Sequence, residues 1–394
     1  MWIERNIEKI ILQISNIRPC ILVTGCRQAG KTSLLKKIFP DFRYISLDIP
    51  LYASEAESAG DIFLQKIGEP VIIDEIQYAP ALLRYIKVKI DEDRDKNGRF
   101  FVTGSQKFSL MQGVSESLAG RVSIITCLPL SLAELEKWYG KQIEGNTLIR
   151  LMFLGGYPEL HAKELDPERF FSDYIVTYLE RDVRQIVNVK NLRVFDTFLR
   201  LLALRSGQIL SSNSLASEVG VSAHTIKSWI DVLEASNIIY LLKPYYANLG
   251  KRLIKSPKIF FLDTGLLAYL LGIHSEDELI KSSFLGAFFE TLVLGQLLKA
   301  YTSLGKNPDI YFYRDLYGHE IDFIIPRADR FHLIECKWSA SPEDIPRGFL
   351  LMEKLIGKER ILSKTVINQR RGFFQNANGI VYADCVDWKW LVEK

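Results

Sequence analysis

The chain has 394 residues, of which 48% are apolar, 25% charged and 11% aromatic. This composition excludes disordered, collagen-like and coiled-coil proteins and predicts a globular chain of about two to four domains. The formal net charge is only +3, but residues 175–260 contain 12 Lys and Arg against 6 Asp and Glu, a local excess of +6. This segment is therefore the first candidate for binding a polyanion.

The N-terminal residues and the cysteines indicate the cellular compartment. Residues 1–6 lack the basic and apolar regions of a signal peptide, and the longest apolar stretches are interrupted by Asp263 and Glu290, so we expect no membrane-spanning segment. The cysteines form no CxxC pair, and their number, five, is odd. Both features favour reduced thiols in a cytoplasmic protein.

A glycine-rich loop follows the first predicted strand, residues 20–24. The loop reads G-x-x-x-x-G-K-T and leads directly into a helical pattern. Backbone N–H groups of such a loop surround the β-phosphate, Lys31 reaches the β- and γ-phosphates, and the Thr32 hydroxyl binds Mg²⁺. We therefore predict a nucleotide site formed by Gly25, Cys26, Arg27, Gln28, Ala29, Gly30, Lys31, Thr32 and Ser33.

Two adjacent carboxylates follow the second buried strand, residues 71–73. We expect Asp74 to contact Mg²⁺ and Glu75 to activate water, a pair that favours hydrolysis over phosphoryl transfer to a small molecule. A third strand, residues 99–103, precedes Ser105 and Gln106, where a polar side chain would sense the γ-phosphate. A turn that merely caps this strand is the structural alternative.

Several motifs along the chain occur together in a known family. In this order, residues 25–32, 71–75, 103–106, 118–122 and 128–131, with the later segments 155–159, 178–183 and 255–265, resemble the AAA-type ATPases of bacteria and archaea that carry a C-terminal domain of uncharacterised function. The family usually has Pro where this chain has Cys26. The resemblance implies ATP hydrolysis, a possible homo-oligomer, and Arg121 as an arginine finger supplied to a neighbouring subunit. A salt-bridged surface arginine is an equally weighted alternative for Arg121.

The middle of the chain changes to a helical pattern and then to shorter elements. Residues 132–204 predict a helical lid over the nucleotide, and residues 209–246 predict a helix-turn-helix with a basic wing, that is, a winged helix. The second helix opens at the N-cap Ser222. The residues expected to contact DNA are His224, Thr225, Lys227, Lys243, Lys251, Arg252 and Lys255. Winged helices also act as packing or protein-docking modules, and this alternative stays open.

The last part of the chain contains three carboxylates and a lysine, in the order Glu, Asp and then Glu-x-Lys. Glu290 lies in an apolar helical run, where a lone charge requires a partner or a metal. Asp322 and the Glu335-x-Lys337 pair lie on two strands of a predicted hairpin. This order resembles the PD-(D/E)XK nuclease core, which implies that Glu290, Asp322 and Glu335 bind Mg²⁺ and that Lys337 orients the attacking water. The alternative is a structural or DNA-gripping domain without cleavage.

Together these features predict an α/β protein with four parts: an AAA-type P-loop ATPase core (1–135), a helical lid (136–205), a winged helix (206–275) and a small nuclease-like α/β domain (276–394). We expect it to use ATP and Mg²⁺ and to act on DNA. The alternative is an ATP-dependent regulatory protein whose last domains bind a protein partner. A small-molecule kinase is disfavoured because the sequence has no separate acceptor-binding motif.

Overall fold

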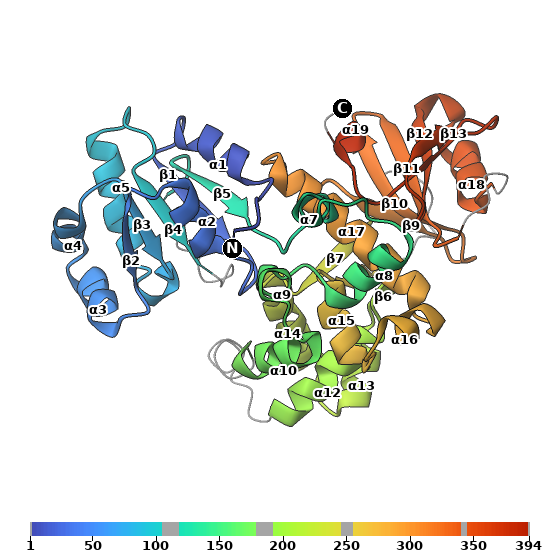
Figure 1. Cartoon of the computed structure of the whole chain (residues 1–394), viewed down its shortest axis with the longest axis horizontal. Coiled ribbons are helices and arrows are strands. Elements are labelled where there is room, and N and C mark those ends of the chain that lie inside the picture. The colour runs from blue at the N-terminus through green and yellow to red at the C-terminus, as the bar shows by residue number, and fades with distance from the viewer. Residues whose placement is uncertain (1, 105–117, 179–191, 246–254, 340–344, 393–394) are drawn as a thin grey trace.

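The computed structural model describes residues 2–104, 118–178, 192–245, 255–339 and 345–392 (Figure 1). An N-terminal α/β lobe lies at one end of the molecule and a C-terminal mixed sheet lies at the other, with helices between them (Figure 1). Among the described residues no helix combines the length and the apolar character needed to cross a membrane.

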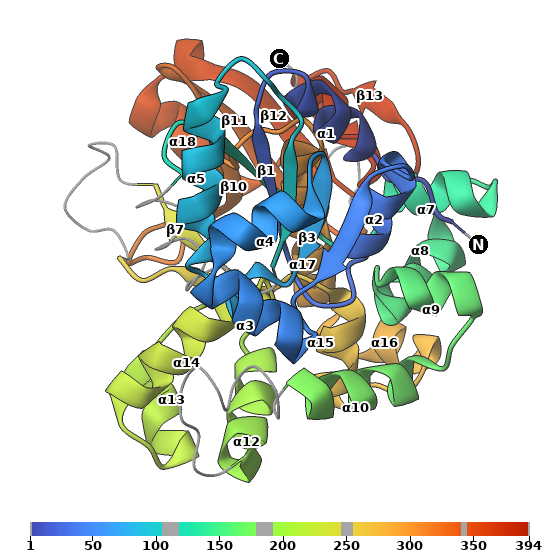
Figure 2. The ribbon, with the colours of Figure 1, turned by 90° about the vertical axis from the view of Figure 1, so that its left-hand side faces the viewer.

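The N-terminal lobe is built on a five-stranded parallel sheet of order β2-β3-β4-β1-β5. Its inner strands are short β-branched and aromatic runs that are buried on both faces, as expected for a covered parallel sheet. In Figure 2 helices α3, α4 and α5 lie in front of the sheet. The elements are α1 (Glu8–Ser15), β1 (Cys20–Thr24), α2 (Lys31–Ile38), β2 (Arg43–Ser46), α3 (Pro50–Ser58), α4 (Gly60–Ile67), β3 (Val71–Asp74), η1 (Ile76–Tyr78), α5 (Leu82–Glu92), β4 (Phe100–Thr103) and β5 (Val122–Thr126).

A set of helices follows the five-stranded sheet. The first begins with a capping box, in which Ser131 and Glu134 satisfy each other's backbone N–H groups. Helix α8 packs against α15, α16 and α17, so these helices contact the C-terminal half of the chain. The helices of this segment are α7 (Leu132–Tyr139), α8 (Gly145–Leu154), α9 (Pro158–Lys163), α10 (Pro167–Tyr178) and α12 (Leu192–Ala203).

The predicted helix-turn-helix is present. Its inward side chains Leu215, Ile226, Ile230 and Leu233 are buried, and Trp229 packs against two phenylalanine rings of α12. Strands β6, β8 and β7 form an antiparallel sheet beside it. The elements are β6 (Gln208–Ile209), α13 (Ser212–Val219), α14 (Ala223–Ala235), β7 (Ile239–Pro244), β8 (Lys258–Phe261), α15 (Thr264–Leu271) and α16 (Glu276–Lys281).

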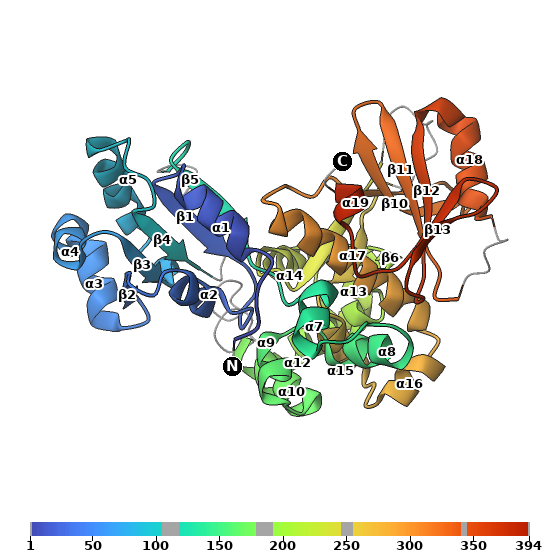
Figure 3. The same ribbon diagram turned by 45° about the horizontal axis from the view of Figure 1, so that its top comes forward.

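The C-terminal sheet continues from the helix-turn-helix unit. Strand β7 pairs with β9 in parallel, which gives one nine-stranded sheet of order β13-β14-β12-β11-β10-β9-β7-β8-β6. Helix α17 lies between this sheet and the N-terminal lobe, and it contacts both α1 and β11 (Figure 3). The elements are α17 (Leu285–Ser303), β9 (Tyr311–Arg314), β10 (Glu320–Arg327), β11 (Arg330–Cys336), α18 (Arg347–Ile356), η3 (Lys358–Arg360), β12 (Ile361–Ile367), β13 (Phe373–Gln375), β14 (Ile380–Ala383) and α19 (Lys389–Val392).

Candidate functional site

The phosphate loop connects the end of β1 to the start of α2. Gly25 has a φ of 135°, and a Cβ at this position would overlap the backbone carbonyl of Cys127, so the turn requires glycine. Lys31 is buried, and its Nζ donates to the backbone oxygens of Gly25 at 3.0 Å and Cys26 at 2.8 Å. The predicted lysine therefore lies inside the loop, within the turn that would surround a phosphate.

Asp74 lies at the end of β3, directly opposite the start of α2. The Thr32 hydroxyl donates to both carboxylate oxygens, at 2.9 and 3.0 Å, so the structure brings together the two residues predicted to contact Mg²⁺. A hydroxyl beside a carboxylate fits this ion, which prefers oxygen ligands. Glu75 follows in a left-handed conformation, with a φ of 58°, and its carboxylate accepts from Gln77.

Two further side chains at this site were not predicted. The Tyr44 hydroxyl donates to Asp74 at 2.9 Å, and Thr103, at the end of β4, also hydrogen-bonds to this carboxylate. Burial and the bond to Asp74 raise the pKa of Tyr44 to about 12. The carboxyl ends of neighbouring parallel strands meet at one edge, which is the signal that relates Thr103 to the site.

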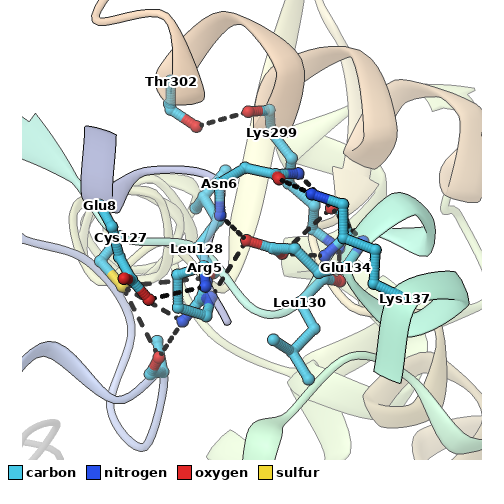
Figure 4. A network of polar contacts seen from close by, with 12 residues as sticks. Arg5, Asn6, Glu8, Cys127, Leu128, Leu130, Glu134, Lys137, Lys299 and Thr302 are labelled. Carbon is cyan, nitrogen blue, oxygen red and sulfur yellow. Dashed lines mark hydrogen bonds and ion pairs between the residues drawn. The ribbon is translucent and has the colours of Figure 1, made fainter. Parts of the chain in front are cut away.

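Arg5 joins the phosphate loop to the helices that follow the sheet. Its Nη1 donates to the carbonyl of Ala29 at 2.9 Å, and its Nη2 donates to the carbonyl of Leu128 at 2.6 Å (Figure 4). Its Nε pairs with Glu134 of α7 at 3.2 Å, and both side chains are buried. Arg5 was not predicted, because no sequence motif surrounds it.

The polar contacts continue from α7 to α17. The Glu134 carboxylate accepts from the backbone N–H groups of Asn6 and Ser131, each at 2.6 Å (Figure 4). Lys299 of α17 donates to the carbonyl of Leu130 at 2.9 Å, and Gln296 accepts from the N–H of Leu132 at 2.8 Å. The segment between β5 and α7 is therefore held on one side by Arg5 and on the other by α17.

Asp263 makes a second junction, between the end of β8 and the start of α9. Its carboxylate caps α15 through the N–H groups of Gly265 and Leu266, both at 3.0 Å, and accepts from Gly156 at 2.7 Å. A Cβ on Gly155 would overlap this carboxylate. Burial raises the pKa of Asp263, although the backbone hydrogen bonds act in the opposite direction.

Cys26, the loop residue where the resembled family usually has Pro, faces this second junction. Its thiol is buried, and Tyr157, the residue after Gly156, is among the groups that influence its pKa. Burial raises the pKa of Cys26 to about 12, so the thiol is protonated at neutral pH. The phosphate loop therefore contacts the same segment that Asp263 holds.

Arg121 lies where the strands of the sheet begin, at the end opposite the phosphate loop. It precedes β5, whose first residue pairs with the first residue of β1, whereas the loop follows the last residue of β1. Its guanidinium forms two hydrogen bonds to Asp91, at 2.8 and 3.0 Å. Arg121 therefore cannot reach the phosphate site of its own subunit. The predicted sensor residues Ser105 and Gln106 lie outside the described residues.

The predicted DNA-contacting residues are placed unevenly. His224 and Lys227 are exposed on the first turns of α14, Thr225 is half-buried there, and Lys243 and Lys255 are exposed near the sheet. Lys251 and Arg252 lie outside the described residues. Lys258 does not contribute to a basic surface, because its side chain is buried and pairs with Glu290, which lies outside residues 175–260.

The structure places a lysine among the carboxylates that were predicted to bind magnesium in the C-terminal part. Lys258 of β8 inserts among the carboxylates, with its Nζ 2.8 Å from Glu290 Oε1 and in contact with Glu320. Asp322 accepts from the N–H of Cys336 at 2.7 Å. Lys337 pairs with Glu335 at 3.1 Å. Within the described parts of the chain, no three His, Cys, Asp or Glu side chains are arranged to hold a metal ion.

The electrostatics of this cluster follow from burial. Burial raises the pKa of Glu290 to about 7 and that of Glu335 to about 8, and the neighbouring Asp322 adds to both shifts. Burial by itself lowers the pKa of Lys258, but the carboxylates of Glu290, Asp322 and Glu320 outweigh it, so the net pKa is raised. The ammonium of Lys258 therefore stays charged, and it is the central cation of the cluster.

Comparison with known proteins identifies the domains in outline. Residues 17–136 match an AAA domain, and residues 145–277 and 285–385 match two domains of unknown function. The Walker-type ATPase paby2304 of Pyrococcus abyssi is 16% identical, with a TM-score of 0.46, over 68% of this chain and 96% of that chain.

Two uncharacterized proteins are similar over most of this chain. One, from Haemophilus influenzae, is 26% identical over 98% of both chains. The other, Rv2008c of Mycobacterium tuberculosis, is 32% identical over 82% of this chain and 71% of its own length. The chain therefore belongs to the same family as the mycobacterial protein, and its residues 17–136, which include the phosphate loop, form an AAA-type ATPase domain.

Proposed function

We propose that this protein is an ATP-hydrolysing switch in which the state of the phosphate loop controls DNA binding by the helix-turn-helix unit. The observation that carries the proposal is a pair of junctions, one made by Arg5 at the loop and one made by Asp263 at the segment next to Cys26 of the loop. Arg5 connects the Ala29 carbonyl to Glu134, and Asp263 connects Gly156 to the end of β8. A change in loop conformation therefore acts directly on segments that lead to α17 and to the sheet.

The roles at the nucleotide site follow from the geometry. ATP binding draws Lys31 away from the loop carbonyls towards the β- and γ-phosphates. Thr32 and Asp74 would hold Mg²⁺, which neutralises the phosphate charge. Glu75 would orient the attacking water, since it follows Asp74 at the same edge of the sheet.

DNA binding is proposed for the N-terminal half of α14. Ser222 caps the helix, so its first turns begin at a fixed position and present His224 and Lys227 to solvent. This is the part of a recognition helix that enters the major groove. Lys243 is exposed on the neighbouring strand β7 and would neutralise a phosphate.

Turnover measurements test the ATPase roles. Lys31→Ala should abolish nucleotide binding, whereas Glu75→Gln should retain binding and lower the rate of hydrolysis by about 100-fold or more. Lys37→Ala, an exposed lysine on the same helix α2, is the matched control and should behave as the wild type. Normal turnover by the Glu75→Gln variant would remove the catalytic role from this residue.

DNA affinity measured by fluorescence anisotropy tests the second part of the proposal. Changing both Lys227 and Lys243 to Glu should weaken binding and lower the slope of log affinity against log salt by about 2. The exposed lysines Lys281 and Lys354, changed in the same way, are the charge-matched control. In the Glu75→Gln variant, affinity should differ between ATP and ADP. If DNA affinity is the same in the charge-changed variant as in the wild type, and the same with ATP as with ADP, the proposed switch is refuted and a protein partner is favoured.

A further inference from the structure

The carboxylate cluster of the C-terminal part has a lysine at the position where the sequence predicts a metal ion. We infer that Lys258 is the permanent cation of this cluster, which consists of Lys258, Glu290, Glu320, Asp322, Glu335 and Lys337. The cluster therefore binds no divalent metal and instead fastens β8 to α17 and β10. This inference is independent of the ATPase site.

The position of the ammonium carries the argument. The Lys258 side chain is only 2% exposed, and its Nζ contacts one carboxylate from α17 and one from β10. Asp322, on the same strand as Glu320, adds to the attraction. Carboxylate groups also surround Mg²⁺ in proteins. Here the position at the centre of the carboxylates is taken by an ammonium group.

The remaining groups also oppose a metal ion. Glu335 is occupied by Lys337, so a second positive charge lies beside the cluster. One oxygen of Asp322 accepts a backbone hydrogen bond. A divalent cation would have to displace Lys258 and leave its ammonium buried without a partner, which is energetically costly.

The three segments that meet here explain what the cluster does. Lys258 opens β8, Glu290 lies on α17, and Glu320 opens β10. Strand β8 is separated from β10 in the sheet by β7 and β9. The long side chain of Lys258 therefore links strands that do not pair, and it ties the helix-turn-helix sheet to the C-terminal sheet.

Manganese binding to the full chain without nucleotide tests the inference, with free Mn²⁺ followed by electron paramagnetic resonance. The wild type, Asp322→Asn, Lys258→Met, the double variant Lys258→Met with Asp322→Asn, and the control Lys281→Met, at an exposed lysine, share the same phosphate loop. We expect Lys258→Met alone to gain one bound Mn²⁺ per chain over the wild type. The second substitution should remove this gain, and Asp322→Asn alone and Lys281→Met should each match the wild type.

Two results would overturn the inference. A folded Lys258→Met variant without the additional Mn²⁺ would show that the ammonium does not stand in a cation position. Loss of a bound Mn²⁺ on changing Asp322 to Asn in the chain that retains Lys258 would show that the native cluster binds metal. This last comparison leaves Lys258 in place, so it decides the question even if Lys258→Met fails to fold.

Discussion

Replacing Asp263 with asparagine removes one hydrogen-bond acceptor from the junction between β8 and α9 and changes little else. One carboxylate oxygen accepts from Gly265 and Leu266, and an asparagine carbonyl can keep both bonds. The other oxygen accepts from the N–H of Gly156. In asparagine an NH₂ group takes the place of this oxygen, and because it is itself a donor it cannot accept from Gly156. Asparagine also caps helices as well as aspartate, so the change isolates the Gly156 contact.

The cost follows from the burial of this contact. A hydrogen bond to a charged group contributes about 1.5–3 kcal/mol, and a buried N–H without an acceptor adds its desolvation. We therefore expect Asp263→Asn to lower the free energy of unfolding by about 2–3 kcal/mol. Asp263→Ala should cost about 1 kcal/mol more, because it also removes the cap of α15.

Urea unfolding followed by tryptophan fluorescence measures these differences. Asp166→Asn is the control, because Asp166 accepts two backbone N–H groups before α10 in an exposed position. Its substitution should change stability by less than about 0.5 kcal/mol. Equal urea midpoints for the Asp263→Asn and Asp166→Asn variants would refute the reasoning, since the buried and exposed acceptors would then be equivalent.

Three further predictions follow from the same structure. Gly25→Ala should lose nucleotide binding, because the added Cβ would overlap the Cys127 carbonyl. Gly120→Ala should retain it, because a Cβ added there has no atom within 4 Å. Equal nucleotide affinity of the two variants would contradict this prediction. Burial lowers the pKa of His161 to about 4, below its ordinary value of 6.5. As the pH falls from 6.5 to 4, the wild type should therefore lose up to about 3 kcal/mol of stability relative to His161→Gln. Parallel curves of stability against pH for the two proteins would disprove this prediction. Trp229→Ala should lower the free energy of unfolding by about 3–5 kcal/mol, because Trp229 fills the space beside Phe195 and Phe198. The control Val88→Ala, at an exposed position, should change it little. A loss below about 1 kcal/mol for Trp229→Ala in thermal or urea unfolding would contradict this packing.

The nucleotide site could be predicted because its residues are fixed by local sequence. Residues 25–32 are contiguous, and Asp74 ends a strand whose carboxyl end must lie beside the loop in a parallel sheet. Tyr44 and Arg5 could not be predicted, because each is a single side chain whose approach depends on tertiary packing.

The C-terminal cluster shows a different limit of sequence reasoning. Glu290, Asp322 and Glu335 were expected near one another, and the charge of Asp322 contributes to the raised pKa of both glutamates. Lys258 lies in a basic segment, where a solvated lysine is the ordinary expectation. Its partners Glu290 and Glu320 lie on α17 and β10, and the pairing of β7 with β9, which the local sequence does not specify, brings β8 and β10 into one sheet. The same pattern of carboxylates predicted a metal ion, whereas the structure places Lys258 among them.

The pairing of β7 with β9 also determines how the chain can be dissected. A fragment that ends at residue 275 would lack β9 and β10, so Lys243 and Pro244 would lose their strand partners and leave an open sheet edge. The same cut removes Glu290 and Glu320, so the Lys258 ammonium loses both of its carboxylate partners. We expect such a fragment to aggregate.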